Sequence, residues 1–357
     1  MNLFNKPILK YFLCFWAVIG ISQFGIAGKK YASPNGSDQA SGTSPSTPLS
    51  LQKAFSASSP LVPGDTLILL DGIYEGNFTL EKSGTASKPI YFLPQNEGKA
   101  IIDPGKNRTT GTGIILNASN VWLIGIHITS SSVSKRSDLG ESVPYESGIT
   151  VFGSNVKLIN CWVYDIPGGG LELWRTALNL EVYGCVIFNN GSQSTDRGTG
   201  HGMYIQHDEP GFPKIIRNNF VFNNASQGIN IFTTNPPNGG VFVIENTAFN
   251  TGSIANFDES LFRPPHNFTV GSSNNLSFFI RAYDNVFFTD LQKGRLTKDL
   301  VSNVSLGRNY QPNQDFQFYR NTLYGGGNQV ELQPLETFKF SENNFFNVHG
   351  KFFQFLT

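Results

Sequence analysis

Several side chains capable of proton transfer or charge neutralisation fall close together in the middle of the chain. They are Glu172, Arg175, His201, Tyr204 and His207. A histidine or a glutamate can take up a proton, a tyrosine can donate one, and an arginine can neutralise a carboxylate. Brought together on one surface, these groups could carry out general acid–base chemistry on a bound molecule.

Aromatic and amide side chains are interleaved with these ionisable groups. The aromatic residues are Phe152, Trp174, Tyr204 and Phe232, and the amides are Gln206 and Asn230. Aromatic rings stack on the C–H faces of sugars, and amides hydrogen-bond to sugar hydroxyls. We therefore predict a carbohydrate-binding face, provided that the strands present these side chains on one side. The alternative is that loops cover the aromatics, which would then form a secondary core.

The elements that must position these residues are short strands, each opened by a glycine. They begin at Gly113, Gly148, Gly170, Gly202 and Gly228. Strand side chains alternate between two faces, so residues such as Ile149 and Val151 should point inward. Two outward columns should result, with neighbours about 4.8 Å apart. These columns are Ile115, Thr150, Glu172, Tyr204 and Asn230, and Asn117, Phe152, Trp174, Gln206 and Phe232.

A corner position recurs along the chain, with an apolar or aromatic residue three positions later. The corner residues are Cys161, Cys185, Asn219, Asn246, Asn285, Asn321 and Asn343. Asparagine tolerates left-handed backbone angles and can hydrogen-bond to an equivalent amide one repeat away. We interpret the two cysteines as a buried stacked pair, with a disulfide as the alternative. Three short strands per repeat predict an all-β, single-stranded right-handed parallel β-helix, or solenoid.

Composition and the N-terminus restrict the compartment and the partners. The net charge is zero and 15% of residues are charged, so no overall field directs the protein to nucleic acid or anionic lipid. Residues 1–27 have the pattern of a signal peptide, with Lys6 and Lys10 before an apolar run and small residues ending at Ala27. A membrane anchor is the alternative, although the run is short for a span. We predict a secreted or periplasmic monomer that has no membrane contact after signal removal.

The predicted β-helix domain covers residues 28–357. Residues 28–75 should form an N-terminal cap and the first strand, and residues 76–357 the rungs and the C-terminal closure. Ser50 fits the N-cap of a short helix over residues 51–57, which would cover the open end of the stack. The segments 130–147, 191–200 and 233–240 predict long loops on one face. Residues 251–275 predict a long excursion with few strand signals.

The opening of the mature chain resembles a known superfamily. The order YASPNGSD, SGTSPSTP, LQKAF and PGDTLILLDGIY is similar to the first segment of secreted right-handed parallel β-helix proteins of the pectate-lyase-like superfamily. Many of those proteins act on polysaccharides, so the resemblance implies a polysaccharide-active protein. It carries no catalytic residue, and the Asp-rich calcium arrangement of pectate lyases and the paired-Asp motifs of polygalacturonases are not found.

The first hypothesis that this resemblance implies is a lyase that cleaves an acidic glycan by β-elimination. Arg175 or Arg197 would neutralise the substrate carboxylate. His201 or His207 would act as the base, and Tyr204 would protonate the leaving oxygen. The same face would bind the polysaccharide or oligosaccharide.

Two further readings stay open. A glycoside hydrolase of the same fold would need two carboxylates, and Glu172 could supply one of them. The second would come from Asp196, Asp208 or Glu209. A non-catalytic glycan-binding surface protein would use the same aromatic face, with Asp196 and Arg197 as added contacts. No cofactor is expected, and Asp208 and Glu209 are weak candidates for calcium, because adjacent polar residues in a turn are usually solvated.

Overall fold

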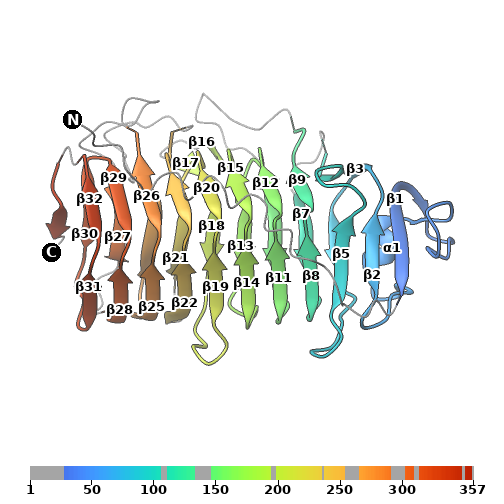
Figure 1. Cartoon of the computed structure of the whole chain (residues 1–357), viewed down its shortest axis with the longest axis horizontal. Coiled ribbons are helices and arrows are strands. Elements are labelled where there is room, and N and C mark those ends of the chain that lie inside the picture. Colours follow the sequence, from blue (N-terminus) through green and yellow to red (C-terminus); the bar gives the residue numbers. More distant parts are fainter. Residues whose placement is uncertain are drawn as a thin grey trace, which may run out of the picture.

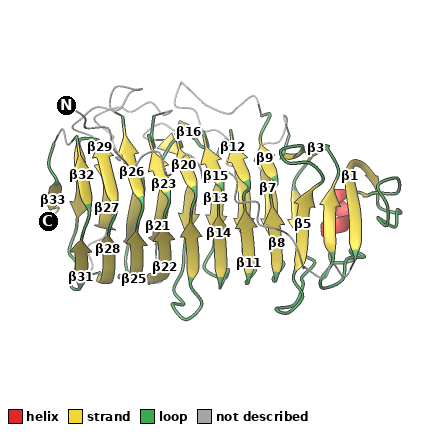
Figure 2. Cartoon of the chain, viewed as in Figure 1, coloured by secondary structure: helices red, strands yellow, loops and turns green. Residues whose placement is uncertain are grey.

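The computed structural model describes residues 28–105, 111–132, 146–193, 198–234, 237–253, 265–290, 302–308, 313–347 and 350–355. Over these residues the chain is an elongated stack of short strands (Figure 1). The helix α1 (Leu51–Phe55) lies at one end of the stack, and the last strands of the chain lie at the other. Figure 2 shows that strands make up nearly the whole described stack. The predicted signal peptide, residues 1–27, lies outside the described residues.

Within the described residues the strands form three long parallel sheets of 11, 10 and 10 strands, which we call sheets A, B and C. Sheet A contains β1 (Lys29–Ser37), β2 (Thr66–Leu69), β5 (Ile90–Pro94), β8 (Val121–Ile124), β11 (Val156–Ile159), β14 (Leu180–Tyr183), β19 (Lys214–Arg217), β22 (Asn238–Ile244), β25 (Ser277–Tyr283), β28 (Gln314–Tyr319) and β31 (Phe338–Ser341). Sheet B contains β3 (Gly72–Glu75), β6 (Ala100–Asp103), β9 (His127–Thr129), β12 (Trp162–Tyr164), β15 (Val186–Phe188), β20 (Phe220–Phe222), β23 (Thr247–Phe249), β26 (Val286–Thr289), β29 (Thr322–Gly325) and β32 (Asn344–Phe346). Sheet C contains β4 (Phe78–Leu80), β7 (Gly111–Leu116), β10 (Glu146–Val151), β13 (Leu171–Leu173), β18 (Met203–Ile205), β21 (Ile229–Thr233), β24 (Phe268–Ser272), β27 (Ser302–Arg308), β30 (Asn328–Leu332) and β33 (Phe353–Phe355). A short antiparallel pair, β16 (Ser192–Gln193) and β17 (Gly198–Thr199), lies outside these sheets.

From β2 onward the chain visits sheets A, B and C in turn, so each rung pairs with the rung before it and the rung after it. One contiguous apolar core fills the space between the sheets. The inward residues predicted for sheet C, such as Ile149, Val151, Met203 and Ile205, have no exposed surface. This arrangement confirms the predicted all-β parallel solenoid.

The repeated glycines are required by close packing between rungs. A Cβ atom on Gly148 would lie 2.3 Å from Cγ1 of Val163 and 2.6 Å from the carbonyl oxygen of Gly170. A Cβ on Gly170 would lie 2.6 Å from the carbonyl oxygen of Gly202. These distances are too short for a side chain, which explains the glycine inside β10 and the glycine directly before β13.

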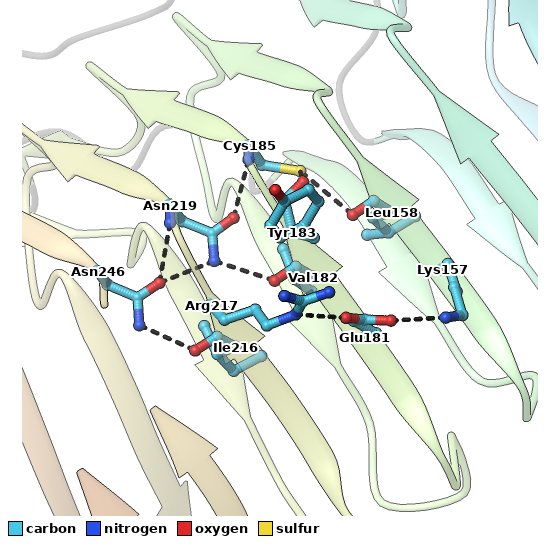
Figure 3. Close-up of polar contacts among 10 residues, drawn as sticks. All are labelled: Lys157, Leu158, Glu181, Val182, Tyr183, Cys185, Ile216, Arg217, Asn219 and Asn246. Carbon is cyan, nitrogen blue, oxygen red and sulfur yellow. Dashed lines mark hydrogen bonds and ion pairs between the residues drawn. The ribbon is translucent and has the colours of Figure 1, made fainter. Parts of the chain in front are cut away.

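The predicted asparagine column runs along the corner between sheets A and B. Nδ2 of Asn219 donates to Oδ1 of Asn246 at 2.8 Å, and Nδ2 of Asn246 donates to Oδ1 of Asn285 at 3.0 Å. Each amide also bonds to the backbone: Nδ2 of Asn219 donates to the carbonyl of Val182 and Nδ2 of Asn246 to that of Ile216 (Figure 3). The column therefore satisfies buried polar groups in successive rungs.

One part of the corner prediction was wrong. The left-handed backbone angle falls on the residue before each corner, with φ of 57° at Asn218, 55° at Glu245 and 59° at Asp284. The corner asparagines therefore contribute their amides, and the turn itself is made one residue earlier. Cys161 and Cys185 occupy the first corners as buried free thiols, in agreement with the predicted stacked pair.

The outer side of sheet B carries a column of rings three residues beyond these corners. The column consists of Tyr164, Phe188, Phe222, Phe249, Phe288 and Tyr324. Neighbouring rings are nearly parallel in its first half, with centroids 5.0 Å apart between Phe188 and Phe222 and 4.7 Å apart between Phe222 and Phe249. Stacking of this kind stabilises the register of successive rungs.

The N-terminal cap agrees with its prediction in type and position. The Ser50 side chain accepts a hydrogen bond from the backbone N–H of Lys53, and α1 buries Leu51, Ala54 and Phe55. The Phe55 ring packs edge-on against Phe92, with centroids 5.3 Å apart. The helix ends at Phe55 and not at the predicted residue 57, because the backbone is already extended at Ser56.

Three strand predictions need correction. The turn-rich segment after residue 28 forms β1, because its backbone pairs in parallel with β2. The predicted strand-poor excursion of residues 251–275 contains β24, which pairs with β21 and β27. The strands β27 and β30 were missed altogether. Pairing with neighbouring rungs decides these strands, and pairing is not visible in local composition.

Among the described residues, the C-terminal end of the stack is closed only in part. Phe345 and Phe353 pack against the core, whereas Phe352 and Phe355 stay 54% and 73% exposed. No helix in the described residues has the length and apolarity needed to cross a bilayer.

Candidate functional site

The outer side of sheet C brings the predicted column of residues together. Thr150 pairs with Glu172, Glu172 with Tyr204, and Tyr204 with Asn230 on successive parallel strands. The second column is also in register, since the backbone N–H of Trp174 donates to Val151 and that of Gln206 to Leu173. Residues far apart in the sequence therefore stand next to one another on β10, β13, β18 and β21.

Tyr204 lies at the centre of this face. Its hydroxyl accepts a hydrogen bond from Nε2 of Gln206 at 3.0 Å. Burial raises the pKa of Tyr204, and the negative charge of Glu172 adds to this effect, while the bond from Gln206 opposes it. Tyr204 thus keeps its proton at neutral pH and can donate it to a leaving oxygen. The carboxylate of Glu172, which is 8% exposed, accepts a bond from Oγ1 of Thr150 at 3.3 Å.

His201 packs on Tyr204 and is held through both ring nitrogens. The two rings are stacked, with centroids 5.6 Å apart. Nδ1 accepts the backbone N–H of Gln227 at 3.2 Å, and Nε2 lies 3.3 Å from the amide nitrogen of Asn230. Oδ1 of Asn230 is buried and has no hydrogen bond within the described part of the chain. A flip of this amide would place the oxygen where it accepts from Nε2–H.

This geometry argues against His201 as the base. A base must offer a lone pair to the substrate, and the Nδ1 lone pair of His201 is already used by Gln227. The ring instead holds Tyr204 and Asn230 in place. The sequence alone could not reveal this, because Gln227 and Asn230 come from the next rung.

An aromatic platform borders the acid–base groups. The rings of Phe152 and Trp174 are stacked with centroids 6.0 Å apart and an interplanar angle of 11°. Trp174 meets Tyr204 edge-on at 6.1 Å. Phe152 is 39% exposed, so one end of the platform is open to solvent and the other continues into the partly buried Tyr204. An open ring beside hydrogen-bonding groups suits a sugar unit.

Arg175 and His207 differ sharply in access. Arg175 is exposed and its Nη1 lies 3.0 Å from Oδ2 of Asp208. His207 is fully buried, beside backbone groups of Glu209 and Phe212 that can hydrogen-bond to its ring. Burial and, to a smaller extent, the nearby charge of Lys214 together lower the pKa of His207 to about 4. A buried, neutral ring cannot reach a substrate, which argues against the predicted catalytic role of His207.

Lys214 is a residue that the sequence analysis missed. It occupies a core position, in register with Leu180 and Val241, and has no exposed surface. Its Nζ donates to the carbonyl of Trp174 and lies 3.5 Å from that of Leu173. Burial lowers the pKa of Lys214 to about 7, although Asp208 opposes this shift. The sequence did contain a signal for this residue, because Lys214 falls at an inward position where neighbouring rungs have apolar residues.

The remaining predicted residues are less closely engaged. Phe232 is partly buried on β21, and Glu209 is exposed. Asp196 and Arg197 lie outside the described residues. Within the described part of the chain, no group of three or more His, Cys, Asp or Glu side chains is close enough to hold a metal ion. Asp208, one of the candidates for the second carboxylate of a hydrolase, forms an ion pair with Arg175.

Comparisons with known proteins agree with this architecture. Residues 30–179 match the family model described as the Pel9A-like, right-handed beta-helix region. The pectate lyase PEL9 of Emericella nidulans is 36% identical over 106 residues, which are 29% of this chain and 25% of that protein. The match thus spans about a quarter of the relative's length.

Solved structures show the same fold over most of the chain. The pectate lyase Pel9A has a TM-score of 0.62 at 20% identity, with 92% of this chain and 79% of that chain covered. The GH136 lacto-N-biosidase of Eubacterium ramulus has a TM-score of 0.56 at 12% identity, covering 92% and 68%. The alginate lyase of a Paenibacillus strain has a TM-score of 0.51 at 15% identity, covering 90% and 99%. The chain therefore has the right-handed parallel β-helix fold, and its residues 30–179 are similar to the Pel9A-like β-helix region, in line with the resemblance of its opening segment.

Proposed function

We propose that this protein binds a polysaccharide along the outer side of sheet C and cleaves it there. The observation that carries this proposal is the pairing of Glu172 with Tyr204 on adjacent strands, beside the platform of Phe152 and Trp174. The relative named pectate lyase PEL9 supports an action on polysaccharides. The signal-like pattern of residues 1–27 supports secretion. A secreted protein would meet polysaccharides outside the cell.

We infer that the reaction is β-elimination within an acidic glycan. A base removes the proton next to the substrate carboxylate, a carbon–carbon double bond forms, and the bond to the leaving oxygen breaks. Tyr204 would protonate that oxygen. Glu172 is the base that the geometry favours, because His201 and His207 are engaged or buried.

The pairing of the two groups also suggests how the site is reset. After the reaction Glu172 holds a proton and Tyr204 lacks one. Their register on neighbouring strands would allow the proton to return to Tyr204, directly or through water. Arg175, which follows Trp174 and is exposed, would neutralise the substrate carboxylate.

A non-catalytic glycan-binding role is the second candidate. The low exposure of Glu172, at 8%, favours it, since a base must reach its substrate. Both functions use the aromatic platform, so binding alone does not separate them.

A glycan panel tests the proposal. The protein is incubated with polygalacturonate, alginate and a neutral galactan, and binding, ultraviolet absorbance and reducing ends are followed. New absorbance from unsaturated ends is the expected result for an acidic glycan. Reducing ends without absorbance would indicate a hydrolase, and binding without either signal would indicate the second candidate. If the protein neither binds nor cleaves any glycan of the panel, the proposal is contradicted.

A further inference from the structure

The polar column on sheet C continues well beyond the candidate site. Asn230 pairs with Thr269, Thr269 with Ser305, and Ser305 with Glu331 on successive strands. Strands in a sheet are about 4.8 Å apart, so Glu331 lies about 24 Å along the column from Glu172, five steps away. Polar side chains therefore line the outer side of sheet C over this whole distance.

Glu331 is held by two neighbours on other rungs. Its Oε1 accepts the hydroxyl of Ser302 at 2.5 Å, and its Oε2 lies 3.5 Å from Nε2 of His266. Nδ1 of His266 faces the carbonyl oxygen of Ser302 at 3.1 Å and must therefore carry a proton that it donates. The serine thus fixes the orientation of the carboxylate from behind, and the imidazole lies against its second oxygen.

Gln227 connects this cluster with the candidate site. Its Oε1 accepts the backbone N–H of His266 at 2.7 Å and the hydroxyl of Thr269 at 2.8 Å. Its own backbone N–H donates to Nδ1 of His201. One hydrogen-bonded network therefore runs along sheet C from His201 to Glu331.

The polar groups of this cluster are almost completely buried. His266, Thr269, Ser302 and Ser305 are each 1% exposed. The Ser305 hydroxyl, between Thr269 and Glu331, has no hydrogen-bond partner among the residues that the structure describes. Buried polar groups normally have partners, so this hydroxyl indicates a missing one. The Glu331 side chain keeps 12% of its surface exposed, more than the other polar side chains of this cluster.

We propose that Glu331, with Ser302 and His266 behind it, is a second carbohydrate-binding centre on sheet C. A carboxylate only accepts hydrogen bonds and has about four lone-pair positions. Ser302 and His266 use one side of each oxygen, and the rest can accept from sugar hydroxyls. The negative charge disfavours a sugar carboxylate at this point, so the centre recognises hydroxyls.

This second centre rests on the proposed function, and it adds a prediction about the length of the glycan that the protein prefers. A glycan held at both centres must reach over about 24 Å, as given by five strand spacings. The preferred ligand is therefore an extended chain of several sugar units that runs along the axis of the solenoid. Short fragments would occupy the Tyr204 centre alone.

Graded oligosaccharides from polygalacturonate, alginate and galactan test this. We expect Glu331→Gln to raise the KM or Kd at least tenfold for fragments longer than about 24 Å, with kcat unchanged. Fragments too short to span both centres should bind the variant and the wild type equally. Ser302→Ala, which removes one support of the carboxylate, should show the same length dependence to a smaller degree. The matched control is Glu336→Gln, an exposed glutamate five residues later that should behave as wild type.

The outcomes are separable. An equal loss for short and long fragments, or no loss for any fragment, would overturn the second centre while the proposed function stands. If the wild type neither binds nor cleaves any of the three glycans, the proposed function fails and the second centre fails with it. A circular dichroism spectrum and a melting curve for each variant show whether it is folded.

Discussion

At the scale of single residues, the site depends on which groups are free to act. Tyr204 retains its proton because burial raises its pKa. Its ring also contacts the aromatic platform through Trp174. His201 and His207 looked equally suited to catalysis in the sequence. The structure argues against both as the base. Nδ1 of His201 accepts a hydrogen bond from Gln227, and His207 is buried.

Replacement of Tyr204 by phenylalanine tests its role as proton donor. Tyr204→Phe removes the hydroxyl and keeps the ring, so glycan binding should persist. We expect kcat to fall by about 100-fold or more, the usual contribution of a positioned acid. The absorbance assay on the active glycan measures this, with Tyr183→Phe, on the outer side of sheet A, as the control. Undiminished cleavage by Tyr204→Phe would exclude the hydroxyl as the acid.

The buried Lys214 makes stability depend on pH. Its pKa is about 7 in the folded protein and 10.5 in the unfolded chain. As the pH falls from 10.5 to 7, the unfolded chain gains the proton first and the folded state loses stability. Below pH 7 both states are protonated and the penalty is constant.

Lys214→Met should therefore stabilise the protein by about 1–4 kcal/mol at pH 6, because a buried charge that is only partly compensated is removed. The gain should shrink as the pH rises from 7 to 10.5. Urea unfolding of the wild type and the variant at pH 6 and pH 10 measures it. Lys99→Met, at an exposed position, should give no pH-dependent difference. A gain for Lys214→Met that is the same at both pH values would show that the charge is not the cause.

At the scale of elements, side-chain columns hold successive strands in register. The asparagine column between sheets A and B joins one rung to the next through amide pairs such as Asn219 with Asn246. The ion pairs of Glu181 with Lys157 and Arg217 join three strands of sheet A (Figure 3). Burial alone would raise the pKa of Glu181, but hydrogen bonds from these two cations lower it overall. Register matters to function, because a shift of one residue would turn Glu172 and Tyr204 inward.

Asn246→Ala tests the contribution of the column. The substitution leaves the backbone N–H of Asn219 and the carbonyl of Ile216 without these partners, and both are buried in the corner. Each unsatisfied buried group costs about 1–3 kcal/mol, so we expect a loss of about 2–6 kcal/mol. Urea unfolding gives the value, and the exposed Asn35→Ala is the matched substitution. A loss no larger than that of Asn35→Ala would mean that water replaces the amide.

At the scale of the whole molecule, the solenoid is a one-dimensional stack in which each rung touches only its neighbours. A destabilising substitution should therefore affect mainly its own rung and the neighbouring rungs, and unfolding should begin at the ends of the stack. The N-terminal end is protected by α1, whose Phe55 ring packs against Phe78 and Phe92. The C-terminal end has no comparable cover among the described residues, since Phe355 of β33 is 73% exposed.

Phe55→Ala should open the N-terminal end. Removal of a fully buried phenylalanine costs about 3–5 kcal/mol. Because contacts are local, native-state hydrogen exchange should accelerate most in β2, β4 and β5 and little in β13 and β18. The control is Phe355→Ala, at the exposed end. Equal acceleration along the entire chain would show that the solenoid unfolds as a single unit.

Much of this architecture was already determined by the sequence. Glycines at the strand starts, apolar residues two apart, and an amide or thiol at each corner predict the stack and the column of Glu172 with Tyr204. These are properties of a repeat, and a repeat makes every rung informative about the others. The cap at Ser50 was likewise visible, because capping is local.

The tertiary structure decided which groups of that face can act. The engagement of His201, the burial of His207 and Lys214, and the link through Gln227 to Glu331 all depend on side chains that meet across rungs of unequal length. Loops of different length separate those rungs in the sequence. The number of residues between two contacting side chains therefore varies, and the contacts cannot be predicted from a fixed spacing. The same cause hid β24, β27 and β30: their backbones are ordered by pairing with neighbours and not by their own composition.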